Sequence, residues 1–253
     1  MSQPVIGIVG SAGAYGRWLQ RFFEQRMRLR VVGHDPADPA SLSPQDLLAS
    51  ADVLVFSAPI RHTVAIVEQY VALAGGREAG QLWLDVTSIK AGPIAAMAHS
   101  QAEVAGLHPM TAPPKAPTLK GRATVICELR LQRWRDWFEQ LLQALEGEYV
   151  RATPEQHDRV MALVQAMVHA SHLAQAGVLR GQQGQVGNLA ALMPFRSAAF
   201  EMDAAILSRI PALNPAIYED IQFGNPHAGD VLAALGAQLA RMAELVGQGD
   251  EAA

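Results

Sequence analysis

Short, nearly uninterrupted apolar runs alternate with helix-like segments through the first half of the chain, and this alternation limits the possible folds. Runs of four or five residues, mostly β-branched or aliphatic, occupy positions 5–9, 31–34, 53–56, 82–86 and 124–127. Helical patterning lies between them, for example over 15–27 and 63–74. Apolar strands separated by helices predict an α/β fold with a doubly wound parallel sheet. We expect a last short strand near 148–151.

The pattern changes after residue 152. The segment Thr153-Pro154-Glu155-Gln156 combines a capping threonine, a first-turn proline and a glutamine, which is typical of a helix start. Apolar residues then recur at helical spacing, prolines interrupt the remainder, and no further β-like run follows. We therefore predict two domains, a sheet domain over 1–152 and an all-helical domain over 153–253.

Composition narrows the class of protein. The net charge of −4 and the pI near 6.1 give no general attraction to nucleic acid or to anionic membranes, so an acidic substrate needs a local basic group. The single cysteine, Cys127, excludes an internal disulfide framework, and the histidines show no metal-ligand spacing. The first residues lack a secretory signal pattern and no apolar run could span a bilayer. We expect a cytoplasmic protein without a metal.

A glycine-rich loop joins the first expected strand to the first expected helix. Glycines at such a junction let the backbone turn tightly and approach a pyrophosphate at the helix N-terminus. The spacing is G-x-x-G-x-x-G, with Ser11 at a position where the commoner G-x-G-x-x-G pattern has glycine. Asp35 ends the second strand, where an acid binds the adenosine ribose and disfavours a 2′-phosphate, so we predict NAD and a Rossmann-type domain. Ala58 and Pro59, after the third strand, are expected to join the cofactor site. The loop residues expected to bind NAD are Gly10, Ser11, Gly13, Ala14, Tyr15 and Gly16.

Two segments are expected at the carboxyl edge of the sheet, where such folds bind ligands. One contains Ser88 and Lys90, after the strand at 82–86, and the other contains His108. Pro109 favours an extended backbone at His108. A neutral imidazole fixed there could accept a proton from a substrate hydroxyl while hydride leaves the same carbon. Without further context, a histidine before a proline is more often an ordinary loop residue.

Several motifs occur together and in order over about residues 4–225. They are DVTSIKAGP, GLHPM, EQHDRVMALVQAMVH and LSRIPALNPAIYEDI. In these motifs the chain resembles the prephenate dehydrogenase family, which includes prephenate, arogenate and cyclohexadienyl dehydrogenases. It is most similar to the dehydrogenase portion of chorismate mutase–prephenate dehydrogenases, including the lengthened glycine loop. We expect that portion alone, without a mutase segment before it or a regulatory domain after it.

The resemblance implies a role for each matching residue of the first domain. His108 corresponds to the catalytic histidine, hydrogen-bonded to the ring hydroxyl of the substrate. Ser88 would hydrogen-bond either that histidine or the hydroxyl. Lys90 either lines the site or solvates a loop. The pair His157 and Asp158 also matches the family, but near a helix start we interpret it as structural.

In the second domain, the resemblance implies that His169 faces the substrate and that Arg209 binds a substrate carboxylate. The alternatives are a packed helix histidine for His169 and, for Arg209, a charge that favours a helix C-terminus. His108 and Arg209 should converge beside the nicotinamide. A helical domain of this size is also expected to share its apolar faces with a second copy, which predicts a homodimer.

The implied reaction is the NAD-dependent oxidative decarboxylation of prephenate to 4-hydroxyphenylpyruvate, a step of tyrosine biosynthesis. Two departures from the family pattern lie near the expected substrate: residues 111–115 replace the usual sequence after His-Pro-Met, and Ala166 stands where many members have histidine. Arogenate and 4-amino-4-deoxyprephenate therefore remain alternative substrates, with Glu201 or Asp203 as candidate partners of the side-chain amine of arogenate. A β-hydroxyacid dehydrogenase and a non-catalytic NAD sensor are further alternatives.

Overall fold

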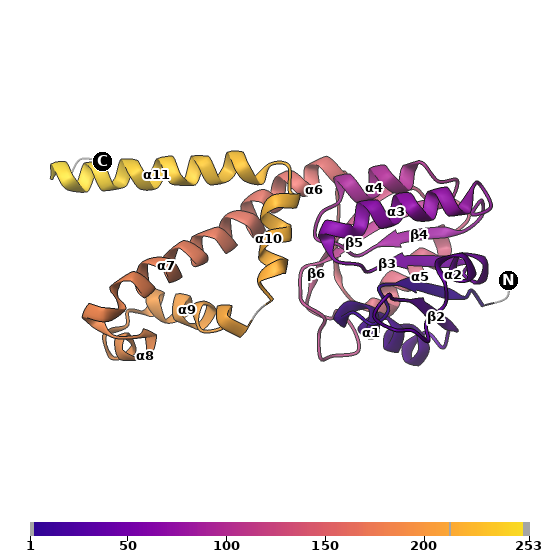
Figure 1. Ribbon diagram of the computed structural model, residues 1–253, viewed down its shortest axis with the longest axis horizontal. Coiled ribbons are helices and arrows are strands. Elements are labelled where there is room, and N and C mark those ends of the chain that lie inside the picture. Colours follow the sequence, from indigo (N-terminus) through magenta and orange to yellow (C-terminus); the bar gives the residue numbers. More distant parts are fainter. Residues whose placement is uncertain (1–2, 213, 250–253) are drawn as a thin grey trace. The chain divides into compact units, whose positions relative to one another are not determined.

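The computed structural model describes residues 3–212 and 214–249 (Figure 1). Contacts divide the chain into a first unit, Met1–Asp158, and a second unit, Arg159–Ala253. The division falls inside helix α6, Pro154–Met161, a few residues beyond the expected boundary at 152/153. The first turn of that helix therefore belongs with the sheet, and this placement matters for the site below.

The described residues of the first unit form a seven-stranded sheet in the order β2-β1-β3-β4-β5-β6-β7. Every neighbouring pair is parallel except β5 and β6, which are antiparallel. The strand order reverses at β1, which lies between β2 and β3, and such a switch point is where doubly wound folds bind ligands. The predicted doubly wound fold is confirmed, with one antiparallel pair added. The strands are β1 Ile6–Val9, β2 Val31–His34, β3 Val53–Phe56, β4 Leu82–Asp85, β5 Glu103–Pro109, β6 Ala123–Arg130 and β7 Glu148–Arg151.

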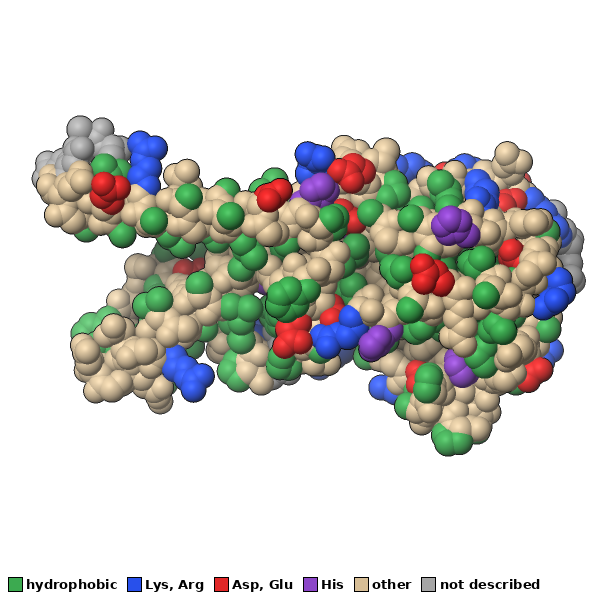
Figure 2. Space-filling model, turned by 45° about the horizontal axis from the view of Figure 1, so that its top comes forward, with side chains coloured by type: hydrophobic (Ala, Val, Ile, Leu, Met, Phe, Trp, Pro, Cys, Tyr) green, Lys and Arg blue, Asp and Glu red, His purple; other side chains and the backbone are tan. Residues whose placement is uncertain are grey.

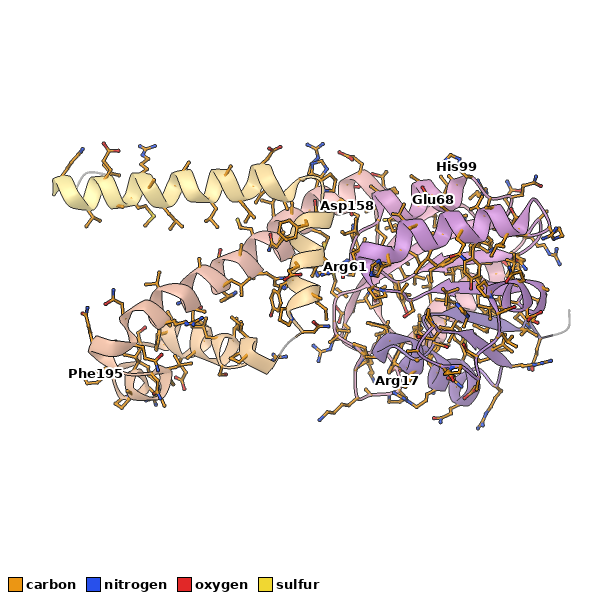
Figure 3. The ribbon with its side chains drawn as sticks, viewed as in Figure 1. Arg17, Arg61, Glu68, His99, Asp158 and Phe195 are labelled. Carbon is orange, nitrogen blue, oxygen red and sulfur yellow. The ribbon has the colours of Figure 1, made fainter. Side chains whose placement is uncertain are left out.

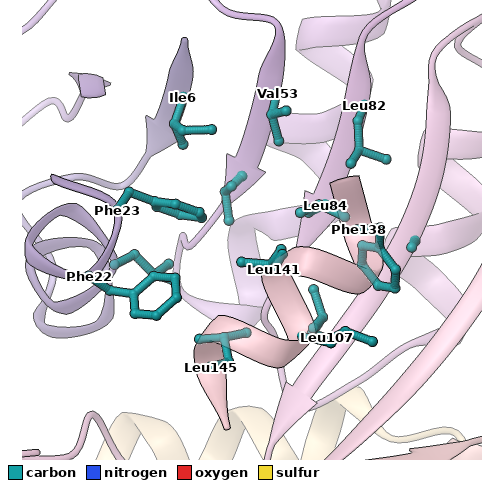
Figure 4. Packing of buried hydrophobic residues seen from close by; sticks show 14 of the residues in the cluster. Ile6, Phe22, Phe23, Val53, Leu82, Leu84, Leu107, Phe138, Leu141 and Leu145 are labelled. Carbon is teal, nitrogen blue, oxygen red and sulfur yellow. The ribbon is translucent and has the colours of Figure 1, made fainter. Parts of the chain in front are cut away.

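Helices cover both faces of the sheet because alternate strand residues point to opposite sides. In β3, Val53 and Val55 belong to a core cluster with the segment 22–26 and α5, whereas Leu54 and Phe56 pack with α2, α3 and α4 on the other face. Figure 4 shows the first of these clusters. Burial on both faces explains why the strands are apolar throughout. The helices are α1 Ala14–Arg21, continued by a π-helical segment Phe22–Arg26, α2 Pro44–Ser50, α3 Ile60–Ala74, α4 Ala91–Ala98 and α5 Arg135–Leu145.

Helices joined by short turns make up the described residues of the second unit, as predicted. Side-chain caps begin several of its helices: Asn188, Ser197 and Asn214 each accept a hydrogen bond from a backbone N–H of the first turn. Among the described residues, no helix is both long enough and apolar enough to cross a lipid bilayer. After α6 come the π-helical segment Ala162–Met167, α7 Val168–Val186, α8 Leu189–Leu192, the 3-10 turn Met193–Phe195, α9 Ala198–Leu207, the 3-10 turn Ile210–Ala212, α10 Pro215–Gly224 and α11 Ala228–Gln248.

The helices of the second unit leave much apolar surface exposed. None of the 19 described residues of α7 is buried, and in α11 the buried residue is Ala228. Val178 on α7 and Val246 on α11 are 66% and 82% exposed. Figure 2 shows hydrophobic side chains spread along α11. Exposed apolar side chains gathered on a few helices are typical of a surface that binds another protein.

Candidate active site

The glycine loop between β1 and α1 requires glycine at two positions. Gly10 has φ +84°, and a Cβ there would approach the carbonyl oxygen of Ser57 at 2.7 Å. A Cβ on Gly16 would overlap the carbonyl oxygen of Gly10, so the helix packs directly on the loop. Gly13 is the N-cap of α1 and provides no side-chain cap. The first N–H groups of α1 are therefore left for an anion such as a pyrophosphate.

Ser11 and Asp35 each make contacts that hold the glycine loop against strand β2. A Cβ on Gly33 of β2 would meet the Ser11 side chain at 2.5 Å, so Gly33 makes room for the serine. The Asp35 carboxylate accepts hydrogen bonds from the backbone N–H groups of Ala12 and Ala37, both at 2.9 Å. Asp35 thus holds the glycine loop in place, and its expected contact with a ribose stays a prediction.

The segment after β3 lies against the glycine loop. Ser57 donates its N–H to the carbonyl of Val9 at 2.9 Å, and the Ala58 nitrogen is 3.1 Å from a Cβ built on Gly10. The hydroxyl of Thr63 in α3 donates to the Pro59 carbonyl at 3.1 Å. The structure therefore brings Ala58 together with the loop residues expected to bind the cofactor, at the switch point of the sheet.

His108 belongs to a buried hydrogen-bonded group at the end of β5. Its imidazole is 2% exposed, and its Nδ1 lies 2.8 Å from Nε2 of His157. Nδ1 of His157 lies 2.7 Å from Oδ1 of Asp158, which is labelled in Figure 3. We call His108, His157 and Asp158 the buried triad. All three residues belong to the first unit.

The carboxylate of Asp158 anchors the buried triad to the start of α4. It accepts the backbone N–H of Lys90 at 2.8 Å and that of Ala91 at 2.9 Å. Burial raises the pKa of Asp158, but the hydrogen bonds from His157, Lys90 and Ala91 outweigh it and hold the pKa below its usual value. The carboxylate is therefore ionised at neutral pH.

The surroundings of His108 favour its neutral form. Burial lowers the pKa of His108 well below its usual value of 6.5, and the nearby Lys90 and His157 lower it further. Among the described residues, none is hydrogen-bonded to Nε2 of His108. At neutral pH the ring is thus an uncharged base with one nitrogen unengaged.

Lys90 does not solvate a loop, so that alternative is wrong, and its expected part in lining the site stays a prediction. Its side chain is fully buried and forms an ion pair with Asp85, which is also fully buried. Its Nζ also donates to the carbonyl of Leu107 at 3.0 Å, and Asp85 accepts from the Thr87 hydroxyl at 2.6 Å. Lys90 therefore ties the ends of β4 and β5 together directly behind His108.

Ser88 is half-buried beside these residues. The hydrogen bonds of the described residues include none between Ser88 and His108, whose Nδ1 is engaged by His157 instead. The first alternative of the sequence analysis, a bond from Ser88 to the catalytic histidine, is absent here. The second alternative, a contact with a substrate hydroxyl, stays a prediction.

The glycine loop and His108 lie at the same edge of the sheet. Strands β1, β3, β4 and β5 run parallel, so their carboxyl ends, which lead to Gly10, Ser57, Asp85 and His108, face one way. The hydroxyl of Tyr15 in α1 donates to the carbonyl of Thr111, just after β5, at 3.2 Å. One sheet edge therefore presents a dinucleotide-type loop and a neutral histidine together.

The second unit holds the other two expected substrate-binding residues. The ring of His169 packs edge-on against Tyr218, with centroids 4.7 Å apart, and burial and His172 lower its pKa. Among the described residues, no partner is found for the buried Nδ1 of His169. Arg209 is exposed just after α9. Tyr218 also lines a hollow of about 380 Å³, together with Leu173, Ile210, Pro215, Glu219, Gln222 and Phe223.

The pair His157 and Asp158 was interpreted as structural from its place near a helix start. In the structure its partners His108 and Lys90 lie 49 and 68 residues away along the chain. Contacts at that separation are invisible to local patterns. Within the described residues, no group of three or more His, Cys, Asp or Glu side chains is placed to hold a metal ion.

Comparisons with known proteins find relatives that match most of the chain. A family model described as the dimerization domain of prephenate dehydrogenase matches residues 153–253. A 4-amino-4-deoxyprephenate dehydrogenase of Streptomyces pristinaespiralis is 31% identical over 96% of this chain and 85% of its own length. A probable arogenate/prephenate dehydrogenase of Methanocaldococcus jannaschii is 24% identical over 95% of this chain, and the T-protein of Enterobacter agglomerans is 29% identical over 87%. The chain spans 56% of the length of each of these last two.

Solved structures share the fold. Prephenate dehydrogenase of Aquifex aeolicus, in complex with hydroxyphenyl propionate and NAD+, superposes with a TM-score of 0.77 at 17% sequence identity. The superposition covers all of this chain and 93% of the Aquifex chain. Synechocystis arogenate dehydrogenase gives a TM-score of 0.68 at 17% identity, over 98% of this chain and 93% of its own. Fold and site define a Rossmann-type dinucleotide-binding protein with a helical second domain. The chain belongs to the prephenate dehydrogenase family.

Proposed function

We propose that this protein is an NAD-dependent dehydrogenase that oxidises and decarboxylates prephenate to 4-hydroxyphenylpyruvate. The observation that carries the proposal is the placement of His108, a neutral and buried histidine at the same sheet edge as the glycine loop. A histidine that acts as general base for a hydroxyl must be neutral and must lie beside the carbon that loses hydride. His108 meets the first condition, and the shared sheet edge supports the second.

The residues of the first unit fit NAD. The uncapped start of α1 suits the pyrophosphate, and the close approach of Gly10 to the Ser57 carbonyl holds the glycine loop against the segment after β3. The Asp35 carboxylate already accepts hydrogen bonds from backbone N–H groups. It can also accept hydrogen bonds from ribose hydroxyls, because each carboxylate oxygen has two lone pairs. When bound, NAD accepts the hydride. The relative from Aquifex aeolicus was solved with NAD+.

The chain's own residues supply orientation and a proton acceptor. Prephenate carries a hydroxyl and a carboxylate at opposite positions of a cyclohexadiene ring. His108 takes the hydroxyl proton as the C–H bond at the same carbon gives up hydride, which leaves a ring ketone. The bond to the carboxylate then breaks, CO₂ leaves, and its electron pair makes the ring aromatic. His108 can return its proton to the phenolate. General base catalysis of this kind contributes about 10²–10⁴-fold.

Residues of the second unit are proposed to hold the substrate. Arg209 is exposed and can bind a carboxylate through two N–H groups. His169, with an unengaged buried Nδ1 among the described residues, is proposed to face the substrate beside Tyr218. The expected convergence of Arg209 with His108 stays a prediction, as does a contact of Ser88 with the substrate hydroxyl.

A second candidate substrate is 4-amino-4-deoxyprephenate. It is favoured by the relative from Streptomyces pristinaespiralis, which matches this chain over 85% of that relative's length. Arogenate is a third, supported by the name of the relative from Methanocaldococcus jannaschii. All three carry a ring carboxylate and lose hydride and CO₂, so the proposed role of Arg209 applies to each. His108 would take its proton from the ring hydroxyl of prephenate and arogenate, and from the ring amine of 4-amino-4-deoxyprephenate.

The test is to follow nicotinamide reduction at 340 nm with NAD and each of the three substrates in turn. We expect prephenate to give the highest kcat/KM, and the variant His108→Asn to lose turnover while it still binds NAD. Turnover of His108→Asn near the wild-type rate would remove the base from the scheme. If NAD is not reduced with any of the three substrates, the proposed function is refuted.

We also propose that the protein is a homodimer formed through the second unit. Support comes from the exposed apolar residues of α7 and α11 and from the match to a dimerization domain. Light scattering should give a mass about twice the 27.1 kDa of one chain. A cytoplasmic location stays a prediction.

A further inference from the structure

We infer that His157 and Asp158 are positioning residues that fix the tautomer of His108, so that its Nε2 is left as the proton acceptor. This inference rests on the proposed function, in which His108 is the base. It follows from assigning each hydrogen-bond donor and acceptor of the buried triad in turn, starting at the Asp158 carboxylate and ending at Nε2 of His108.

The first step is the carboxylate. An ionised carboxylate accepts hydrogen bonds and cannot donate them. Asp158 already accepts from the backbone N–H groups of Lys90 and Ala91, at the N-terminus of α4, where the helix dipole also favours negative charge. Its 2.7 Å contact with Nδ1 of His157 therefore requires that this nitrogen carries a proton.

The second step passes along the two rings. A neutral imidazole has one N–H and one bare nitrogen, so a proton on Nδ1 of His157 leaves its Nε2 as an acceptor. That Nε2 lies 2.8 Å from Nδ1 of His108, which must then be the donor. His108 is left with its Nε2 bare. This is the tautomer that a general base needs.

Burial makes this assignment strict. His157 and Asp158 have fully buried side chains and His108 is 2% exposed, so water cannot readily replace a missing donor or acceptor. A second proton on His157 would turn its Nε2 into a donor and force His108 into the opposite tautomer. After His108 takes up a proton, the same contacts hold its imidazolium in place, with the negative charge of Asp158 one ring away.

Two substitutions at His157 separate positioning from packing. His157→Gln keeps an acceptor oxygen near the place of Nε2, whereas His157→Leu has a similar volume and no acceptor. We expect His157→Leu to lower kcat by about 100-fold, within the range of general base catalysis, with KM for NAD and for substrate changed less than about threefold. His157→Gln should retain kcat within about tenfold of wild type. A loss of packing alone would affect both variants alike.

A second measurement needs no enzyme activity. Imidazole ¹⁵N NMR of the ¹⁵N-histidine-labelled protein reports which ring nitrogen carries the proton, and His108→Asn identifies the His108 signals. We expect His108 to carry its proton on Nδ1 at neutral pH in the wild type, and a mixture of tautomers in His157→Leu. A wild-type His108 protonated on Nε2, or a His157→Leu variant with kcat within threefold of wild type, would overturn the inference.

The two proposals can fail separately. If NAD is reduced with none of the three substrates, the proposed function fails whatever the tautomer is, and if His108→Asn stays active, the base proposed for the reaction fails. If His108→Asn is inactive but His157→Leu is not, the base stands and the positioning role is refuted.

Discussion

The buried ion pair between Lys90 and Asp85 gives a quantitative prediction for stability. Both side chains of the pair are fully buried. In Lys90→Met the buried carboxylate of Asp85 therefore loses its counter-ion. Breaking a buried pair by removing one partner costs about 3–5 kcal/mol. Asp85 keeps the hydrogen bonds from the N–H and hydroxyl of Thr87, at 3.0 and 2.6 Å, which places the cost near the lower limit. We expect the free energy of unfolding to fall by about 3 kcal/mol.

Tryptophan fluorescence in urea measures this change selectively. The chain has four tryptophans, and all of them lie in the first unit. Their signal therefore follows the unfolding of the unit that contains the ion pair. With a slope of about 2 kcal/mol per M urea, a loss of 3 kcal/mol shifts the midpoint by about 1.5 M. The exposed Lys120 provides the control, and Lys120→Met should leave the midpoint unchanged.

A double variant tests the cause. In Lys90→Met/Asp85→Asn the buried charge is gone, but the amide oxygen can still accept from Thr87. This variant should unfold at a higher urea concentration than Lys90→Met, because an unpaired buried charge costs more than a hydrogen-bonded amide. A loss below about 1 kcal/mol in Lys90→Met, or no recovery in the double variant, would refute the reasoning.

Three further predictions concern the site. Since burial, Lys90 and His157 hold the pKa of His108 well below 6.5, kcat/KM should stay level as the pH falls through 6.5 and decline only in more acidic solution, where the base is protonated; a midpoint above 6.5 in a pH profile would contradict this. In Gly16→Ala the methyl group would overlap the Gly10 carbonyl, so calorimetry should show NAD binding at least about tenfold weaker, and unchanged affinity would mean that the loop tolerates a shift. Arg209→Gln should raise KM about 10–100-fold with little change in kcat, and a change confined to kcat would contradict the anchor role.

Much of the fold could be predicted from the sequence, because its strands are short and buried on both faces. The strand that carries His108 was missed. Residues 103–109, Glu-Val-Ala-Gly-Leu-His-Pro, include alanine, glycine and proline, which are uncommon in strands. In the structure Gly106 is required by its neighbours, because a Cβ there would lie 2.7 Å from Asp85 Oδ2 and 2.9 Å from the Lys90 side chain. Gly106 therefore weakens the strand pattern in the sequence, and the same glycine lets the strand pass beside the ion pair of Lys90 and Asp85.

The site was predicted where local sequence decides it. The glycine loop and Asp35 depend on a strand and helix that adjoin each other, and the structure does bring them together. Lys90 was misjudged because a lysine is almost never fully buried unless it is paired, and its partner Asp85 was not recognised as such. His157 and Asp158 lie far along the chain from His108 and Lys90. Their contacts depend on how the first turn of α6 packs, which no local pattern reports.

The hydrogen bonds from Lys90 and Ala91 to Asp158 also decide where the protein can be cut. A shortened polypeptide that stops at residue 152 would have every strand of the sheet, yet its α4 would begin without a carboxylate and His108 would face solvent in place of His157. One that continues to the end of α6 at Met161 would keep both. Attempts to isolate a nucleotide-binding half for titration or crystallisation should therefore choose the longer endpoint.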